Sequence, residues 1–432
     1  MTRAELDVFI AGEHAGVLSQ EDSGALSYRY LREYRGVPLS SAMPLSTREY
    51  RDKTILPYLW GLLPEDIATR KRVAAEANIS YNNPFALLSV IGLDCPGAVQ
   101  FCKQGEKGMR EERLIPISES DIAHRLSQAR NDNSGWGWIA ANEHWSLGGQ
   151  QSKFALRKQN NEWFVCEGAA ATTHIFKSGV RNLSHQALNE YVCMQVAREC
   201  EIDVAKTEYH EFEGERGIEP AIVIARYDRV ISGKNVTRLH QEDFCQALGC
   251  LPDNKYTMYG GPGTADILKF LISTGSAAQT NAAGFLQMLF FNYLFAATDA
   301  HAKNYSLLLN PNGSHRLAPM YDVASIAPYI EPGQWKKKPP KLAMSIGGEN
   351  RIGYLSSRHL SKMIEQCELE NVNITADGCV NLIAHYAEII PRKLAAVFDA
   401  LEKTNAATAS KEIRERMEEP IVRLCAKTIE RL

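Results

Sequence analysis

The sequence has neither an excess of positive charge nor a long run of hydrophobic residues. Its 48 lysines and arginines are balanced by 51 aspartates and glutamates, which leaves a net charge of −3 at pH 7. Without a net positive field the surface as a whole attracts nucleic acid only weakly, so contact with DNA or RNA would need a local basic patch. The longest apolar stretch, residues 282–297, contains Gln287 and Asn292 and is shorter than the ~20 residues of a membrane-spanning helix. We expect it to form a buried helix.

The chain also lacks the cysteine patterns of disulfide-rich and zinc-binding proteins. Its ten cysteines include no CxxC pair, and none stands at metal-ligand spacing from a histidine. This usage is typical of reduced, buried thiols in a cytoplasmic protein. The first residues already include the acidic Glu5 and lead into a strand-like alternation, so we expect no signal peptide.

The composition is that of an ordinary globular protein. Of the 432 residues, 45% are hydrophobic and 23% are charged. At about 150 residues per domain the chain has room for about three. We predict an α+β protein with a β-rich domain over residues 1–105, a second sheet-containing domain over 115–238 and a helical domain over 239–432. The charged, glycine-containing stretch 103–112 marks the first boundary.

Hydrophobic periodicity predicts the main elements. Leu6, Val8 and Ile10 alternate before a glycine-containing turn, which indicates a hairpin. Helical spacing and apolar runs predict helices over 55–63, 65–78, 85–91, 118–128, 184–200, 241–248, 265–273, 281–297 and from 358 onward, and strands over 97–101, 153–157, 163–166, 173–177, 221–225, 305–309 and 316–321.

The most informative segment is Thr298-Asp299-Ala300-His301-Ala302-Lys303-Asn304, which lies between a predicted buried helix and a strand. Asp299 and Asn304 stand five residues apart, and Asp322 follows the next strand. Phosphoryl transfer uses such a set, because one carboxylate accepts the proton of the attacking hydroxyl while an Asn oxygen and a second carboxylate hold Mg²⁺. Each residue alone would also suit an ordinary loop, where Asp and Asn bond to nearby backbone.

Upstream residues could bind the phosphates. A loop with Gly148 and Gly149 precedes Lys153, and glycines in such a loop let backbone N–H groups approach phosphate. Lys177 ends a predicted strand and Glu190 lies in the following helix, the arrangement with which protein kinases hold ATP. The simpler interpretations are a plain turn, a solvated strand end and a solvated helix face.

The order of these parts is that of a two-lobed kinase, and the chain resembles the HipA family along nearly its whole length. HipA proteins are the kinase toxins of bacterial type II toxin–antitoxin modules. The motifs that carry the resemblance are, in chain order, Met43-Pro44-Leu45, Gly61-Leu62-Leu63-Pro64-Glu65, SLGGQQSKFAL (146–156), Thr172-Thr173-His174-Ile175-Phe176-Lys177, Asn189-Glu190, Arg226-Tyr227-Asp228-Arg229, Gln241-Glu242-Asp243-Phe244-Cys245-Gln246, Gly260-Gly261-Pro262-Gly263, TDAHAKNYS (298–306), Tyr321-Asp322 and Lys341-Leu342-Ala343-Met344.

The resemblance implies a protein-kinase-like fold of two lobes, with an extra N-terminal β-rich subdomain and an all-helical C-terminal lobe. It makes Asp299 the catalytic base, places His301 at the γ-phosphate, and makes Asn304 and Asp322 the magnesium ligands. Lys177 would contact the ATP phosphates, supported by Glu190, and Lys153 and the Gly148-Gly149 loop would lie over them.

Further roles follow from the same resemblance. Ala225, Arg226 and Tyr227 fall where backbone of the interlobe hinge meets adenine, and Ala225 stands where other members have Glu. Ser146 matches the family's autophosphorylation position, at which phosphorylation inactivates the enzyme by expelling the loop from the site. Asp322 is followed by Val323-Ala324, so a DFG switch is absent, and we find no APE signature; regulation would run through Ser146 and a partner.

The implied function is that of a cytoplasmic serine/threonine protein kinase using MgATP. Its target would be an aminoacyl-tRNA synthetase, with the glutamate enzyme as the leading choice, and its phosphorylation would block translation and arrest growth, as in persistence. A small HipB-like helix-turn-helix antitoxin would neutralise the toxin and connect it to operator DNA.

Two alternatives stay open at the level of sequence. The Asp299-x-His301-x-x-Asn304 spacing also resembles the phosphoinositide kinases, which suggests a lipid or small-molecule substrate. A kinase-shaped corepressor without catalysis is the other alternative, although every catalytic position is intact. The basic stretch 334–340 would be a solvated loop, or a contact to tRNA on a substrate enzyme or to operator DNA.

Overall fold

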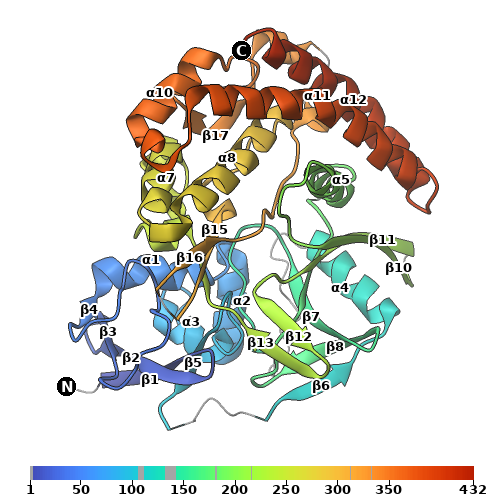
Figure 1. Cartoon of the computed structure of the whole chain (residues 1–432). Coiled ribbons are helices and arrows are strands. Elements are labelled where there is room, and N and C mark those ends of the chain that lie inside the picture. Colours follow the sequence, from blue (N-terminus) through green and yellow to red (C-terminus); the bar gives the residue numbers. More distant parts are fainter. Residues whose placement is uncertain are drawn as a thin grey trace. The chain divides into compact units, whose positions relative to one another are not determined.

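We describe the protein from a computed structural model, whose described residues are 3–105, 111–131, 143–180, 182–215, 217–311, 313–331 and 333–432 (Figure 1). The chain divides into two compact units, and each is treated by itself. The first comprises Met1–Arg181, Phe212–Asp253 and Ser306–His315, and the second Asn182–Glu211, Asn254–Tyr305 and Arg316–Leu432. The three domains expected from the sequence stay a prediction, and residues 106–110 of the first boundary lie outside the described residues.

The first unit opens with a five-stranded sheet. Leu6, Val8 and Ile10 of its strand β1 (Arg3–Ile10) are at most 1% exposed, as their alternation predicts. The strand β1 pairs antiparallel with β2 and with β5, so the predicted hairpin is confirmed. In spatial order the strands are β4 (Tyr50–Arg51), β3 (Leu26–Tyr30), β2 (Glu13–Glu21), β1 (Arg3–Ile10) and β5 (Val99–Lys103).

Three helices pack beside this sheet, and all three were predicted. They are α1 (Asp52–Leu62), α2 (Ile67–Ala77) and α3 (Pro84–Ile91). Asp66 caps α2 by accepting a hydrogen bond from the backbone N–H of Thr69, and Asn83 caps α3 in the same way through Ala86. Pro84 occupies the first turn of α3, where its missing N–H costs nothing.

The second sheet of this unit carries Lys177 of the predicted nucleotide site, and its strand β7 (Phe154–Gln159) begins directly after Lys153. Lys177 ends the strand β9 (His174–Lys177), which pairs antiparallel with β7 and with β11 (Gly217–Ala225). The helix α4 (Glu119–Asn131) contacts β11. In spatial order the strands are β10 (Thr207–Gly214), β11 (Gly217–Ala225), β9 (His174–Lys177), β7 (Phe154–Gln159), β8 (Glu162–Glu167) and β6 (Arg113–Pro116); a separate hairpin joins β12 (Arg229–Ser232) to β13 (Asn235–Arg238).

The segment 241–248 corrects one sequence prediction. It begins as a strand, β14 (Gln241–Asp243), which pairs with β15 (Ser306–Leu309), and only α6 (Phe244–Ala247) is helical. Asp243 is the point of change, because its carboxylate accepts the N–H of Gln246 while the Gln246 side chain accepts the N–H of Asp243. This capping box starts a helix where the apolar spacing alone suggests a continuous one.

The second unit is mainly helical. The predicted buried helix is α8, and most of its residues from Ala278 to Leu294 are buried. Among the described residues no helix combines the length and the apolar character needed to cross a membrane. The helices are α5 (Gln186–Glu199), α7 (Thr264–Ile272), α8 (Ala278–Leu294), α9 (Gln334–Lys337), α10 (Ser357–Cys367), α11 (Ala376–Leu401) and α12 (Ala407–Ile429), with 3₁₀ turns at Thr257–Tyr259, Gly275–Ala277, Ala302–Asn304, Ala327–Tyr329 and Leu369–Val372.

The expectation of an all-helical C-terminal lobe needs correction. Residues 239–432 also contain β14, β15, β16 (His315–Leu317), and a hairpin of β17 (Lys341–Ile346) with β18 (Glu349–Arg351). Along the chain, β15 and β16 follow the Asp299 loop, and β17 follows the basic stretch. The basic stretch itself is the short helix α9 followed by exposed Lys338, and its contact with a nucleic acid stays a prediction.

The cysteines agree with the predicted buried thiols. All ten lie in the described part of the chain, none is paired in a disulfide, and only Cys250 is more than slightly exposed. Burial raises the pKa of Cys200, Cys379 and Cys425 to about 12, so these thiols stay protonated and unreactive at neutral pH.

Glu242 of β14 makes the stability of the first unit depend on pH. Its side chain is fully buried and accepts hydrogen bonds from Ser40 Oγ at 2.5 Å and from the N–H of Ser41 at 2.8 Å, and His315 Nε2 lies 3.0 Å from Ser41 Oγ. Burial raises the pKa of Glu242 to about 7, and neighbouring Asp243 adds to this, because burial disfavours the charged form.

We therefore expect Glu242→Gln to stabilise the protein above neutral pH. The folded state holds the Glu242 proton more tightly than the unfolded chain does. The stability that this proton contributes is therefore present at low pH, and it is lost as the pH rises from the ordinary pKa of a glutamate towards 7. The loss is about 3 kcal/mol, and the variant, whose amide does not titrate, would not undergo it. Denaturant titrations at about pH 5 and about pH 8 test this, with Glu213→Gln on the surface as control. Parallel pH profiles for wild type and Glu242→Gln would contradict it.

Candidate active site

The second unit brings Asp299, His301, Asn304 and Asp322 into one loop region after α8. Beyond the helix, Ala296 adopts a left-handed conformation (φ 50°), and the N–H of Ala297 returns to the carbonyl of Asn292 at 2.8 Å. The side chain of Asn292 also donates to Tyr305 Oη at 2.8 Å, which ties the end of the loop to α8. These contacts hold the chain in a tight loop that presents Asp299 on the surface while His301 is buried.

The amide of Asn304 has a defined orientation. Its Nδ2 donates to the carbonyl oxygens of Asp299 and Asp322, each at 3.3 Å. Because the nitrogen side of the amide is used in this way, Oδ1 points away from both carbonyls and is the atom left to accept or to bind a cation. An oxygen donor of this kind suits Mg²⁺.

Asp322 is held next to Asn304 by the backbone. It adopts a left-handed conformation (φ 59°), which Asp tolerates better than most residues, and the preceding Tyr321 donates its hydroxyl to the carbonyl of Lys303 at 2.7 Å. Among the described residues no three or more His, Cys, Asp or Glu side chains form a metal cluster. An ion held by Asn304 and Asp322 would therefore take further ligands from nucleotide and water, as Mg²⁺ does at phosphate sites.

His301 is buried with its ring against an aromatic side chain. The ring of Tyr256 meets it edge to face with centroids 4.9 Å apart, and Tyr256 Oη donates to Asp299 Oδ1 at 2.6 Å. The backbone N–H of His301 also donates to the carbonyl of Asp299 at 2.8 Å. Sequence reasoning did not identify Tyr256, and the only available signal was its place just before the Gly260-Gly261-Pro262-Gly263 motif.

The first unit holds the residues predicted to bind nucleotide. Lys177 is 4% exposed and pairs with Ile222 across β9 and β11, while Ala225 pairs with His174. Glu190 is buried in α5 of the second unit, so its pairing with Lys177 stays a prediction.

Lys153 lies against the glycine loop of the same unit. Its Nζ donates to the carbonyl of Gly148 at 2.5 Å. A side chain at Gly149 (φ 100°) would meet Lys153 Nζ, and one at Gly148 would lie 2.7 Å from the carbonyl of Gly61. Both glycines are therefore needed for this close packing, which also pairs Gly149 with Pro64.

Ser146 is fully buried at the start of this loop. Its hydroxyl donates to the carbonyl of Leu62 at 2.5 Å, and its N–H donates to the carbonyl of Asp94 at 3.0 Å. A phosphate on Ser146 would place negative charge against a carbonyl oxygen at a fully buried position, so the loop cannot hold phosphoserine in this position.

The backbone of Arg226 is largely engaged within the first unit. Its N–H donates to the carbonyl of Thr173 at 2.9 Å, and its carbonyl accepts from Arg229 at 3.2 Å. An adenine contact by Arg226 would have to use the second lone pair of that carbonyl. Tyr227 donates its hydroxyl to Gln241 Oε1 at 2.7 Å, and the adenine contacts of Ala225, Arg226 and Tyr227 stay a prediction.

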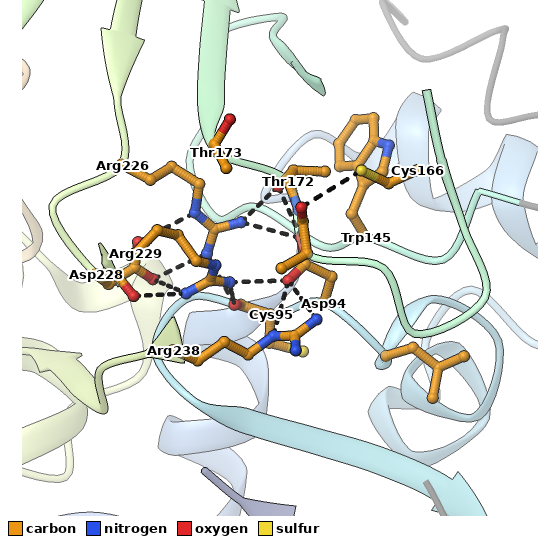
Figure 2. Close-up of polar contacts among 12 residues, drawn as sticks. Asp94, Cys95, Trp145, Cys166, Thr172, Thr173, Arg226, Asp228, Arg229 and Arg238 are labelled. Carbon is orange, nitrogen blue, oxygen red and sulfur yellow. Dashed lines mark hydrogen bonds and ion pairs between the residues drawn. The ribbon is translucent and has the colours of Figure 1, made fainter. Parts of the chain in front are cut away.

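The side chain of Arg226 belongs to a buried ion cluster that the sequence did not predict (Figure 2). Asp94 lies at its centre and accepts from Arg229 at 2.8 Å, from Arg226 at 3.2 Å and from Arg238 at 3.2 Å. Asp228 accepts from Arg226 and Arg229. Burial alone would raise the pKa of Asp94, but the guanidinium groups of Arg229 and Arg226 hold it below its usual range. The cluster joins the loop after α3 to the segment that follows β11.

Comparison with known proteins gives consistent matches. The family model described as HipA N-terminal domain matches residues 6–102, and that described as HipA-like C-terminal domain matches residues 145–415. A protein of Sinorhizobium fredii named as a candidate kinase, Y4mE, is 31% identical over 91% of this chain and 93% of its own length. The serine/threonine-protein kinase toxin HipA of Shewanella oneidensis is 28% identical over 90% of this chain and 87% of its own.

A solved structure supports the same fold. HipA of Shewanella oneidensis, in a complex with HipB and its operator DNA, superposes with a TM-score of 0.80 at 24% identity, and the match covers 98% of this chain and 97% of that one. The α+β fold predicted from the sequence is therefore confirmed.

Proposed function

The chain belongs to the HipA family, and from that premise we propose that it is a serine/threonine protein kinase that uses MgATP. The observation that carries the proposal is the Asp299 loop. It presents an exposed carboxylate beside an amide oxygen, that of Asn304, whose orientation is fixed by two backbone carbonyls. This is the arrangement that phosphoryl transfer needs.

In the proposed reaction each residue has one task. Asp299 accepts the proton of the attacking serine or threonine hydroxyl, whose oxygen forms a bond to the γ-phosphorus while the bond from that phosphorus to the β–γ bridging oxygen breaks. Lys177 and Lys153 contact the phosphates, and Asn304 and Asp322 would hold Mg²⁺. When bound, Mg²⁺ neutralises charge on the phosphates. His301 would face the γ-phosphate.

The adenine would lie against the backbone of residues 225–227. Ala225 is the last residue of β11, so contacts made by main-chain atoms tolerate its lack of a long side chain. The carbonyl of Arg226 offers one lone pair, as described above.

The target we propose is an aminoacyl-tRNA synthetase, with the glutamate enzyme first, and the setting is the cytoplasm. Phosphorylating it would block translation. HipA of Shewanella oneidensis supports a toxin–antitoxin context, since it is named a kinase toxin and was solved with HipB and operator DNA. We propose a HipB-like antitoxin as the neutralising partner, and contact with DNA through that partner.

We further propose that phosphorylation of Ser146 inactivates the enzyme. The hydroxyl of Ser146 is buried and bonded to Leu62, so the loop must leave its place before the hydroxyl can be phosphorylated. Once modified, the loop could not return, because the phosphate has no place beside that carbonyl.

Intact-mass measurement after incubation with MgATP tests the function. We expect one phosphate on the wild type, none on Ser146→Ala, and none on the wild type when EDTA removes Mg²⁺. Synthetases added as a panel would report the external target, and lipid vesicles would report a lipid kinase. Wild-type protein that binds MgATP but phosphorylates neither itself nor any synthetase would contradict protein kinase activity and favour the corepressor alternative.

A further inference from the structure

Tyr256 makes a contact with Asp299 that a substrate hydroxyl would also make. Its phenol donates to Oδ1 of the carboxylate at 2.6 Å. Within the described part of the chain, no hydrogen bond reaches the second oxygen, Oδ2. A carboxylate held through one oxygen keeps one orientation and offers the other oxygen to a reactant.

Tyr256 is itself held from two sides. Its ring packs edge to face on His301, and the next residue, Thr257, donates its hydroxyl to the carbonyl of Ala343 in β17 at 2.6 Å. The N–H of Ala343 donates in turn to the carbonyl of Thr298, the residue before Asp299, at 3.1 Å. The tyrosine and the base are therefore fixed to the same strand, so their relative position is defined by the fold of the second unit.

The glycine motif after Tyr256 forms a tight turn at the end of this segment. A side chain at Gly261 would lie 1.9 Å from the carbonyl of Asn254, and Gly260 has a φ of 85°. The N–H of Gly261 returns to the carbonyl of Tyr256 at 3.0 Å. Only glycine fits in so tight a turn. The turn holds Tyr256 beside Asp299, and this explains why the motif is rich in glycine.

The same segment carries the two most exposed large apolar side chains of the described residues. Met258 is 77% exposed and Tyr259 is 61% exposed, and the ring of Tyr259 lies edge to face with that of Tyr256 at 6.2 Å. Exposed apolar side chains of this size, on the segment whose Tyr256 bonds to Asp299, suit the binding of another polypeptide.

We propose that residues 256–263 form the acceptor-binding element of the kinase. Tyr256 is a positioning residue that fixes the carboxylate of Asp299, and Met258 and Tyr259 bind an apolar side chain near the serine or threonine to be phosphorylated. The occupant is a segment of the substrate protein. The inference rests on the proposed kinase function and adds to it which residues select the acceptor.

Phosphate transfer uses Oδ2 of the positioned carboxylate. The acceptor hydroxyl gives its proton to Oδ2 of Asp299, its oxygen bonds to the γ-phosphorus, and ADP leaves with the electrons of the broken bond to the bridging oxygen. Tyr256 keeps its own proton throughout and stays bonded to Oδ1.

The variant Tyr256→Phe tests the positioning role. It keeps the ring against His301 and removes only the hydroxyl, so we expect kcat to fall by about 10- to 100-fold, with the Kd for MgATP and the melting temperature as in the wild type. Both self-labelling and ATP hydrolysis by water serve as readouts. Tyr81→Phe, at a half-buried tyrosine in the first unit, is the matched control and should be fully active.

The double variant Met258→Ala/Tyr259→Ala tests the binding role. Serine-centred peptide libraries with one flanking position varied at a time serve as acceptors. We expect the wild type to prefer an apolar residue at one or more flanking positions, and the double variant to lose that preference with a KM for such peptides about tenfold higher. The control Val230→Ala/Ile231→Ala removes two exposed apolar side chains from β12, and we expect it to retain the preference.

The outcomes separate this inference from the proposed function. A wild type that transfers phosphate to no acceptor, including water, while it binds MgATP defeats the kinase proposal and the inference with it. An active wild type matched in kcat by Tyr256→Phe defeats the positioning role alone. An active wild type that labels none of the peptides, shows no apolar preference, or shares its preference with the double variant defeats the binding role alone.

Discussion

Asp299→Asn is expected to lower kcat for phosphate transfer by about 10²- to 10⁴-fold, the usual contribution of a general base. Asparagine has nearly the same shape and its Oδ1 can still accept the hydroxyl of Tyr256, so the loop should keep its fold. What it cannot do is take a proton from the acceptor. Rates of self-labelling and of synthetase labelling measure the loss, and the Kd for MgATP should stay unchanged.

Growth on induction provides the second readout of Asp299→Asn. Cells expressing the variant should grow, whereas cells expressing the wild type without an antitoxin should arrest. Asp253→Asn, which removes an exposed carboxylate outside the loop, is the matched control and should arrest growth like the wild type. If Asp299→Asn arrested growth and labelled protein at the wild-type rate, the proton would have another acceptor and the assigned base would be wrong.

The Asp299 loop could be predicted because its chemistry is close in sequence. Asp299, Asn304 and Asp322 lie within one helix–loop–hairpin segment, so spacing alone indicates that they meet. The strands and helices with strong periodicity, such as β1 and α8, were found for the same reason. Local pattern failed at residues 241–243, where pairing with β15, more than sixty positions later, decides for strand.

The supporting contacts could not be predicted, because they join distant parts of the chain. Tyr256 meets Asp299 across 43 positions, and Arg226 meets Asp94 across 132. A lone tyrosine before a glycine motif and a lone aspartate after a helix carry no signal of their partners. Their roles follow only from the fold, which brings a hydroxyl to one carboxylate and three guanidinium groups to the other.

The largest expected effect on stability follows from the buried cluster around Asp94 (Figure 2). Asp94→Asn should lower the free energy of unfolding by about 3–5 kcal/mol, because it leaves the three arginines of the cluster with one carboxylate, that of Asp228, which pairs with Arg226 and Arg229. The side chains of Arg226 and Arg229 are at most 1% exposed, so water cannot replace the lost charge. Burial, with Arg226 beside it, already lowers the pKa of Arg229 to about 10. Denaturant titration measures the loss, and Glu49→Gln in an exposed pair with Arg51 should cost below about 1 kcal/mol.

Arg238→Gln distinguishes a charge imbalance from a general packing defect. Arg238 is the most accessible arginine of the cluster, with 12% of its side chain exposed, and it pairs with Asp94. Removing it from the Asp94→Asn protein leaves the cluster with two arginines rather than three for the one carboxylate of Asp228. The double variant should therefore be more stable than the sum of the two single losses predicts, by about 0.5–3 kcal/mol. Additive losses would mean that Asp94 acts through its hydrogen bonds to Thr172, at 3.0 Å and 2.7 Å, and not through charge.

The cluster is also connected to the Ser146 loop, because the carbonyl of Asp94 accepts a hydrogen bond from the N–H of Ser146. A variant that disorders the cluster should therefore loosen this loop and speed the phosphorylation of Ser146.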